Sequence, residues 1–285
     1  MNGGASYAIA LLVLILLALH TAQTGLPYIL HYYDNVTRGN EQRPSTRGYF
    51  RAFTVEWFYG AAVWLAYPFG IFGGAVRDHF DPSGGPPILL CHGYFMNRAC
   101  FFSLYWRLRR AGYRNVHVLN LRPLISSLGD QAERLERQVR LVSTVAGGRG
   151  VIGIGHSQGG ILLRWVGLRT NAPLERVLTI GSPHHGTRVA HLALGINARE
   201  MLPGSKVLED LEESGDVPIT SFYSDLDQIV NPAESAKLGQ DNRFFAETGH
   251  FSLLYNPVVL DAVIAALPPA QMREPSKAAS QETTS

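Results

Sequence analysis

The amino-acid sequence predicts an α/β fold, in which a mostly parallel sheet is covered by helices on both faces, behind an N-terminal membrane helix. After the turn-rich segment at 81–87, short apolar runs alternate with amphipathic segments, the pattern of βαβ units. The chain has 285 residues, of which 46% are hydrophobic and 17% charged, so it can bury a large core and is not globally disordered. The net charge of +2 gives no basic excess of the kind that binds nucleic acid.

The N-terminal segment predicts a membrane anchor over residues 1–30. No Asp, Glu, Lys or Arg occurs from Ala5 to Leu30, and every residue from Ala8 to Leu19 is apolar. A helix that spans a bilayer needs about 20 mostly apolar residues. The alternative is a cleaved signal peptide, but no basic residue precedes the apolar stretch, and His20 fits poorly at position −3 of a cut after Ala22.

Residues 31–85 form a membrane-proximal segment that we expect to be helical. Its apolar stretch, Ala52–Val76, contains Glu56 and Pro68. Because a carboxylate is costly inside lipid, a helix packed on the following domain or lying at the membrane surface is favoured over a second span. The arginines at positions 38, 43, 47 and 51 fit either a cytoplasmic loop or contact with anionic headgroups, so the orientation stays open.

The elements of a single domain over residues 86–267 follow from the hydrophobic pattern. Strands are expected at 88–91, 116–121, 151–155, 177–180, 219–223 and 243–246. Helices are expected at 101–111, 131–145, 158–169 and 258–267. The polar tail at 268–285 is expected to be disordered. Cys91 ends an apolar run and is expected to be buried, with a disulfide to Cys100 as the less favoured alternative.

The strongest chemical signal is the segment Gly155-His-Ser-Gln-Gly159, which lies between an expected strand and an expected helix. In such a Gly-x-Ser-x-Gly turn the serine sits on a tight, strained backbone, and larger side chains two residues to either side would collide. The turn lifts the Ser157 hydroxyl above the sheet. Ser157 is therefore the expected nucleophile.

A serine hydroxyl needs a base, and the base needs an orienting acid. His250 follows the last expected strand in a Gly-His loop, so it lies at the same edge of the sheet as Ser157 and is the expected base. The acid should follow the preceding strand, where Asp225 and Asp227 are both candidates. We favour Asp227, because it directly precedes an apolar pair that re-enters the core, and Asp225 is then a turn residue.

Backbone amides are needed to stabilise the negative charge that develops on the substrate oxygen. One is expected from Gln158, at the start of the helix after the nucleophile, and the other from Tyr94, where Gly93 lets the chain turn toward the site. The remaining residues expected to contact substrate lie in the same loops; they are His92, Gly93, Phe95, His156 and His184.

Together these segments resemble the bacterial lipase and esterase branch of the α/β hydrolases. The resemblance is carried by Leu90-Cys-His-Gly-Tyr94, by the Ser157 turn, by Gly181-Ser-Pro-His-His-Gly-Thr187, and by the Asp227 and His250 pair. It implies the α/β-hydrolase fold over residues 86–267, with a short cap at 188–217. The apolar residues of this cap form either a lid that faces lipid or plain core packing; they are Val189, Leu192, Ala193, Ile196, Met201 and Leu202. It also implies a Ser157–Asp227–His250 triad and an oxyanion hole formed by Tyr94 and Gln158. Some similar secreted lipases bind calcium through an aspartate two residues after the histidine, but Ser252 stands there, so we expect no metal and no other cofactor.

The resemblance and the anchor imply a lipase or carboxylesterase that cleaves lipid esters through an acyl-enzyme on Ser157. The expected partners are an acyl-ester substrate and a membrane, which for this branch is the bacterial inner membrane, on a side that the sequence leaves open. Two alternatives remain: acyl transfer or thioester cleavage by the same triad, and a non-catalytic membrane scaffold. The sequence leaves the acyl length, the headgroup and the oligomeric state open.

Overall fold

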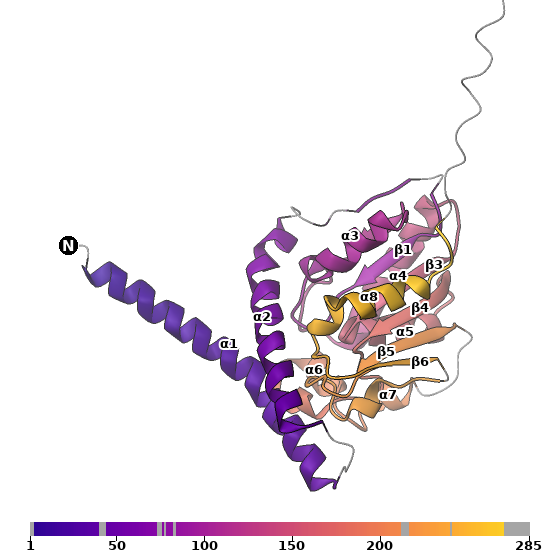
Figure 1. The fold of residues 1–285 in the computed structure, drawn as a ribbon. Helices are drawn as coiled ribbons and strands as arrows, with labels where there is room; N and C mark the ends of the chain where they lie inside the picture. Colours follow the sequence, from indigo (N-terminus) through magenta and orange to yellow (C-terminus); the bar gives the residue numbers. More distant parts are fainter. Residues whose placement is uncertain are drawn as a thin grey trace, which may run out of the picture.

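A six-stranded parallel sheet forms the centre of the domain (Figure 1). The computed structural model describes residues 3–39, 44–72, 76, 78–81, 84–211, 217–239 and 241–270. Within this part of the chain, the strand order is β2-β1-β3-β4-β5-β6, and every neighbouring pair is parallel. The strands are β1 (Ile88–Cys91), β2 (Val116–Val118), β3 (Val151–His156), β4 (Leu174–Ile180), β5 (Ile219–Ser224) and β6 (Asn242–Phe245).

The central strands are continuous apolar runs because both faces of the sheet are covered. All four residues of β1 and all six of β3 are buried. The expectation for β2 was too long, since the strand ends at Val118 instead of Leu121. This strand pairs with the short β1 and, through an antiparallel bridge at Val116, with His79, and beyond it the Leu121 amide donates to Nε2 of His92 instead of to a strand.

Helices cover the two faces in pairs. Helices α3 (Phe102–Arg110) and α8 (Pro257–Ala265) pack on one face, and α4 (Leu128–Val145) and α5 (Gln158–Arg169) pack on the other. Helix α4 begins three residues before its expected start, because the Ser127 side chain accepts a hydrogen bond from the Asp130 amide and caps the helix. The short 3₁₀ helices are η1 (Arg98–Phe101), η3 (Ala233–Ala236) and η4 (Ser252–Leu254).

The order of the strands places a crevice between β1 and β3. From β1 the chain moves outward to β2, and from β3 it moves the other way through β4, β5 and β6. The loops after β1 and β3 therefore diverge at their carboxyl ends, which is where open parallel sheets bind ligands. His92 and Ser157 follow these two strands directly.

Two long helices precede the domain. In Figure 1, α1 (Gly3–Thr37) projects away from the sheet, and α2 (Thr46–Ile71) lies between α1 and the domain. Residues Ala5–Thr37 are long and apolar enough to cross a membrane. One face of the C-terminal half of α1 is covered by protein, with Tyr28, His31 and Asp34 buried, while Ile29 and Tyr33 are exposed. Helix α2 packs on the domain, as expected, and its Tyr67 carbonyl accepts a hydrogen bond of 2.7 Å from Nδ2 of Asn97.

A cap lies between β4 and β5. It contains η2 (Arg188–Leu192), α6 (Ile196–Glu200) and α7 (Lys206–Glu209), while residues 212–216 of the expected cap lie outside the described residues.

Cys91 and Cys100 are both buried free thiols, so the structure does not contain the alternative disulfide. Of the tail expected to be disordered, residues 271–285 also lie outside the described part of the chain.

Candidate active site

The backbone at Ser157 has the strained conformation that the glycine motif predicts. Its φ is 56° and its ψ is −128°, a region that costs a non-glycine residue about 1–3 kcal/mol. The strand-to-helix turn is held on one side by the Ser157 amide, which donates to the Ile180 carbonyl at 2.9 Å. The turn leaves the side chain facing the cavity at the carboxyl end of the sheet.

The flanking glycines permit this turn because backbone segments touch there. A Cβ atom at Gly155 would lie 2.5 Å from the Gly160 Cα, inside the same turn. A Cβ atom at Gly159 would meet the Cys91 carbonyl oxygen at the end of β1. The second glycine is therefore required by the neighbouring strand, and the turn is compressed from both sides.

The loops after β5 and β6 bring the expected acid and base together. Nδ1 of His250 lies 2.9 Å from both carboxylate oxygens of Asp227, and both side chains are buried. Oδ1 of Asp227 also accepts hydrogen bonds of 3.0 Å from the amides of Ile229 and Val230, which orient the carboxylate. With Nδ1 occupied by Asp227, Nε2 is the nitrogen of His250 that remains to exchange a proton with a substrate or a serine.

The two candidate acids have different surroundings. Oδ1 of Asp225 accepts a hydrogen bond of 2.7 Å from the Glu247 amide, which ties the β5 loop to the chain after β6. Asp225 thus holds a turn, and Asp227 contacts the histidine. The assignment of Asp227 as the acid stays a prediction.

The electrostatic surroundings stabilise a protonated His250. Burial disfavours the imidazolium, but the Asp227 carboxylate, its hydrogen bond and the Glu56 carboxylate outweigh this effect and raise the pKa of His250. His156 packs against His250 with ring centroids 4.5 Å apart, and burial keeps the pKa of His156 well below the ordinary value. His156 is therefore neutral and adds no competing charge.

Ser157 and His250 line a common cavity of about 510 Å³. Its wall is mostly apolar and comes from α1, α2, the loop after β1 and the cap, together with Pro183, Ile229 and Phe251 of the loops after β4, β5 and β6. The residues from α1 and α2 are Gln23, Leu26, Pro27, Val63, Trp64 and Tyr67. Those from the cap include Val189, Ala190, Leu192, Ala193, Leu194 and Met201, so four of the six apolar cap residues expected at the site are present there and Ile196 and Leu202 are not.

The loop after β1 contributes Tyr94 and Phe95 to this cavity. Gly93 lies directly against the nucleophile, because a Cβ atom there would be 2.8 Å from the Ser157 Cβ. The Tyr94 hydroxyl bonds to the backbone of Leu194 in the cap, with a distance of 3.0 Å from the Leu194 amide. The Tyr94 amide thus lies in a loop that touches both the nucleophile and the cap.

Gln158 is the first residue of α5, so its amide has no acceptor within the helix. Its side chain points away from the chemistry into a buried network, in which Nε2 donates to Oε1 of Gln131 at 2.7 Å and Oε1 accepts from Asn197 at 3.1 Å. The role expected for Gln158 therefore rests on its backbone amide alone, and the oxyanion hole stays a prediction.

Three histidines expected to contact substrate are buried away from the cavity wall. Nε2 of His92 accepts from the Leu121 amide, and burial lowers the pKa of this imidazole to about 4. His156 contacts the His250 backbone carbonyl through Nε2 at 3.2 Å. His184 is fully buried, with Nε2 3.0 Å from the Thr179 hydroxyl. None of the three lines the cavity that contains Ser157 and His250, so their contact with substrate stays a prediction.

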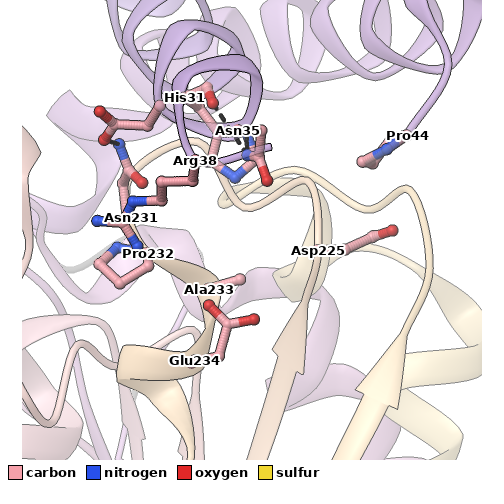
Figure 2. A pocket seen from close by; sticks show the side chains of 10 residues that line it. His31, Asn35, Arg38, Pro44, Asp225, Asn231, Pro232, Ala233 and Glu234 are labelled. Carbon is pink, nitrogen blue, oxygen red and sulfur yellow. Dashed lines mark hydrogen bonds between the residues drawn. The ribbon is translucent and has the colours of Figure 1, made fainter. Parts of the chain in front are cut away.

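A second, polar cavity of about 310 Å³ lies beside the acid loop, where the end of α1 meets residues 231–234. Figure 2 shows His31, Asn35 and Arg38 of α1 facing Asn231 and Glu234. Asp34 bonds to Nδ2 of Asn231 at 2.7 Å and to Arg188 of the cap at 2.9 Å. These contacts attach α1 to both the acid loop and the cap.

Glu56 and Gln228 are the site residues that the sequence analysis did not assign. Glu56 is completely buried on α2 and bonds to Gln228 and to the loop after His250. The sequence did contain a signal, since a single carboxylate within an apolar helix must find buried donors.

Among the described residues, no group of three or more His, Cys, Asp or Glu side chains is arranged to hold a metal ion.

Comparison with known proteins agrees with this architecture. The profile of the Alpha/beta hydrolase family matches residues 88–273, and no curated protein matches the chain significantly. The mature form of the Bacillus licheniformis lipase BlEst2 superposes with a TM-score of 0.58 at 20% identity, over 67% of this chain and 94% of that one. Aspergillus fumigatus lipase B superposes with a TM-score of 0.58 at 21% identity, over 66% of this chain and 55% of that one.

A third solved structure, the alpha/beta hydrolase MGS-MChE2 from a lagoon-sediment metagenome, has a TM-score of 0.50 at 18% identity, over 64% of this chain and 89% of that one. At such identities these similarities show the fold. The family profile spans the sheet, the Ser157 turn and the loops that hold Asp227 and His250. This chain therefore belongs to the alpha/beta hydrolase family.

Proposed function

We propose that this chain is a membrane-anchored serine hydrolase that cleaves carboxylic esters of lipids through an acyl-enzyme on Ser157. The observation that carries the proposal is the meeting of the strained Ser157 and the Asp227-paired His250 in one mostly apolar cavity. An acid–base pair with a serine beside it is the arrangement that activates a hydroxyl at neutral pH.

On this proposal the Ser157 hydroxyl attacks the ester carbonyl carbon while its proton passes to Nε2 of His250. Asp227 holds the Nδ1 proton and stabilises the imidazolium that forms. The amides of Tyr94 and Gln158 are assigned to the negative charge on the carbonyl oxygen. The carbon–oxygen bond then breaks, and the alcohol leaves with the proton from His250. Water attacks the acyl-serine by the same route and releases the acid.

The cavity wall favours an acyl chain as the occupant. Leu26 and Pro27 of α1 and Trp64 and Tyr67 of α2 form part of the wall around the serine. Because α1 is the helix long and apolar enough to cross a membrane, the cavity lies beside the segment that would enter the lipid. A lipid ester could thus reach Ser157 with its acyl chain kept in apolar surroundings.

The proposal predicts that detergent-solubilised protein hydrolyses p-nitrophenyl esters and reacts with a fluorophosphonate probe at Ser157. Replacing Ser157 with Ala removes the nucleophile, so labelling should disappear and kcat should fall by about 10⁶-fold, because triad members act as a unit. The buried Ser182 supplies the matched control, and Ser182→Ala should keep its labelling. A wild-type protein that neither labels nor hydrolyses any ester would instead be a scaffold.

A panel of acyl lengths then tests the substrate class. Medium and long chains should have a higher kcat/KM than acetate, because each buried methylene contributes roughly 0.8 kcal/mol. An equal preference for acetate would contradict a lipid substrate. Acyl transfer and thioester cleavage share the same acyl-enzyme, so products analysed with added acceptor alcohols and with acyl thioesters distinguish them from ester hydrolysis.

A further inference from the structure

Glu56 is a buried carboxylate that the proposed chemistry does not use. It lies on α2 with no exposed surface, in a helix of otherwise mostly apolar residues. Removing a carboxylate from water costs several kcal/mol unless hydrogen bonds replace the lost hydration. The groups that donate hydrogen bonds to Glu56 therefore indicate which segments this side chain holds in place.

The groups that donate hydrogen bonds to Glu56 belong to the two loops that carry the proposed acid and base. The Phe251 amide donates to Oε1 at 2.6 Å, and the Ser252 amide and hydroxyl donate to Oε2 at 2.9 and 2.7 Å. Nε2 of Gln228 donates to Oε1 at 3.0 Å. Phe251 directly follows the base and Gln228 directly follows the acid, so one carboxylate bridges both loops.

Gln228 extends this bridge to the histidine itself. Its Oε1 accepts the backbone amide of His250 at 3.1 Å, while its Nε2 donates to Glu56. Gly249 allows the close approach, because a Cβ atom there would collide with Glu56 and with the Tyr28 hydroxyl. The backbone on both sides of His250 is therefore held from α2.

We propose that Glu56 is a positioning residue of the triad, and that α2 belongs to the catalytic machinery as well as linking the anchor to the domain. Through its contacts with Gln228, Phe251 and Ser252, it holds His250 against Asp227 and toward Ser157. This role rests on the proposed function, since it concerns the geometry of the same acid–base pair.

The charge of Glu56 also acts on the base. The groups that face His250 from the surrounding elements are Asp227 on the β5 loop, Glu56 on α2 and the neutral His156 before the nucleophile, with Tyr28 of α1 beside Gly249. Burial lowers the pKa of His250, and the carboxylates of Asp227 and Glu56 together raise it. Removing the Glu56 charge should therefore lower this pKa, and the base should stay neutral down to a lower pH.

The variant Glu56→Gln tests the proposal in the full-length protein. Glutamine keeps the size but replaces one carboxylate oxygen with an NH₂ group, so either the Ser252 amide and hydroxyl at Oε2 or the Phe251 amide and Gln228 at Oε1 lose their acceptor. We expect kcat to fall about 10- to 100-fold with little change in KM, as for a small misplacement of a catalytic group. We also expect the acidic limb of the kcat/KM–pH profile to move to lower pH, which a merely structural perturbation would not produce.

A matched control is Glu200→Gln, because Oε2 of Glu200 also accepts a hydrogen bond from a backbone amide, that of Leu128, but this bond joins the cap to the start of α4 instead of to the loops that carry Asp227 and His250. This variant should keep the wild-type kcat and pH limb. Wild-type kcat and an unshifted limb in Glu56→Gln would overturn the inference, provided that the wild-type protein labels at Ser157. Failure of wild-type labelling would count against the proposed function instead.

If Glu56→Gln does not fold, Gln228→Met tests the same bridge. It removes both hydrogen bonds of the Gln228 amide but leaves the Glu56 carboxylate and its contacts with Phe251 and Ser252. We expect kcat to fall while the acidic limb stays in place, because both carboxylates near His250 remain. A folded Gln228→Met protein with wild-type kcat would overturn the proposal.

Discussion

At the residue scale, the chemistry depends on one buried contact between an imidazole and a carboxylate. His250 and Asp227 are 3% and 1% exposed, so their hydrogen bond competes little with water. The amides of Ile229 and Val230 orient the Asp227 carboxylate. Asp225, two residues earlier, also accepts a hydrogen bond from a backbone amide, but that amide is Glu247.

We therefore predict that replacing each of the two aspartates with Asn affects kcat very differently. Asp227→Asn should lower kcat by about 10³- to 10⁴-fold, because the amide cannot hold the required tautomer or stabilise the imidazolium. Asp225→Asn keeps an oxygen for the Glu247 amide and should leave kcat nearly unchanged. Steady-state kinetics of both variants on one p-nitrophenyl ester measure this difference, and the reverse ranking would make Asp225 the acid.

At the scale of single elements, the turn after β4 packs closely against the side chains of Asp227 and His250. Gly181 has a φ of 54°, and a Cβ atom there would lie 2.7 Å from Oδ2 of Asp227 and 3.3 Å from Nδ1 of His250. The glycine is thus required twice, once for its backbone conformation and once for the space that the acid and base occupy.

We expect Gly181→Ala to separate Asp227 from His250 and to lower kcat by about 10²-fold or more, since misplacing a catalytic group by 1 Å can cost that much. Gly147→Ala is the matched control: Gly147 also has a positive φ, of 74°, but a Cβ atom there meets nothing within 4 Å. The control should lose about 1 kcal/mol of stability and keep its activity. Thermal melting and kinetics together separate the two effects, and equal kcat losses would contradict the argument.

At the scale of the whole molecule, α1 has two halves with different surroundings. The side chains from Ala5 to Leu19 are exposed, including large apolar ones, whereas Thr24, Tyr28, His31 and Asp34 are buried against the rest of the protein. Asp34 binds both the acid loop and the cap. The exposed apolar side chains of the first half can contact lipid, whereas the buried side chains of the second half pack against the folded domain.

Deleting residues 2–19 should therefore release the protein from membranes without destroying the active site. The deletion removes the apolar surface that attaches the chain to lipid, so the protein should appear in the supernatant after an alkaline wash. It should keep its kcat on short soluble esters. Deleting residues 2–38 also removes Asp34 and the other buried contacts, and should lower the melting temperature and kcat together. A 2–19 deletion that still sediments with membranes would contradict the assignment of the anchor.

Much of the fold and part of the site follow from local patterns. The apolar runs that form β1 and β3 and the glycine-flanked Ser157 turn can be recognised from neighbouring residues, because strand burial and turn strain act over a few positions. The loops after β5 and β6 were located by the same means, and with them Asp227 and His250. The ends of two elements differ from the expected ones. Helix α4 starts earlier because Ser127 caps it, and β2 ends at Val118 because its partner strand is short.

The tertiary structure alone decided which side chains meet. His92, His156 and His184 have the sequence positions of substrate-binding residues, but the core covers them, and burial is set by segments distant along the chain. Glu56 lies 195 positions before the Phe251 amide that it binds, and no local pattern encodes that separation. The sequence by itself thus determined the strands, the strained serine and the order of acid and base, because these depend on near neighbours. The apolar cavity wall is completed, and the backbone around His250 is held, only when α1 and α2 pack against the rest of the domain.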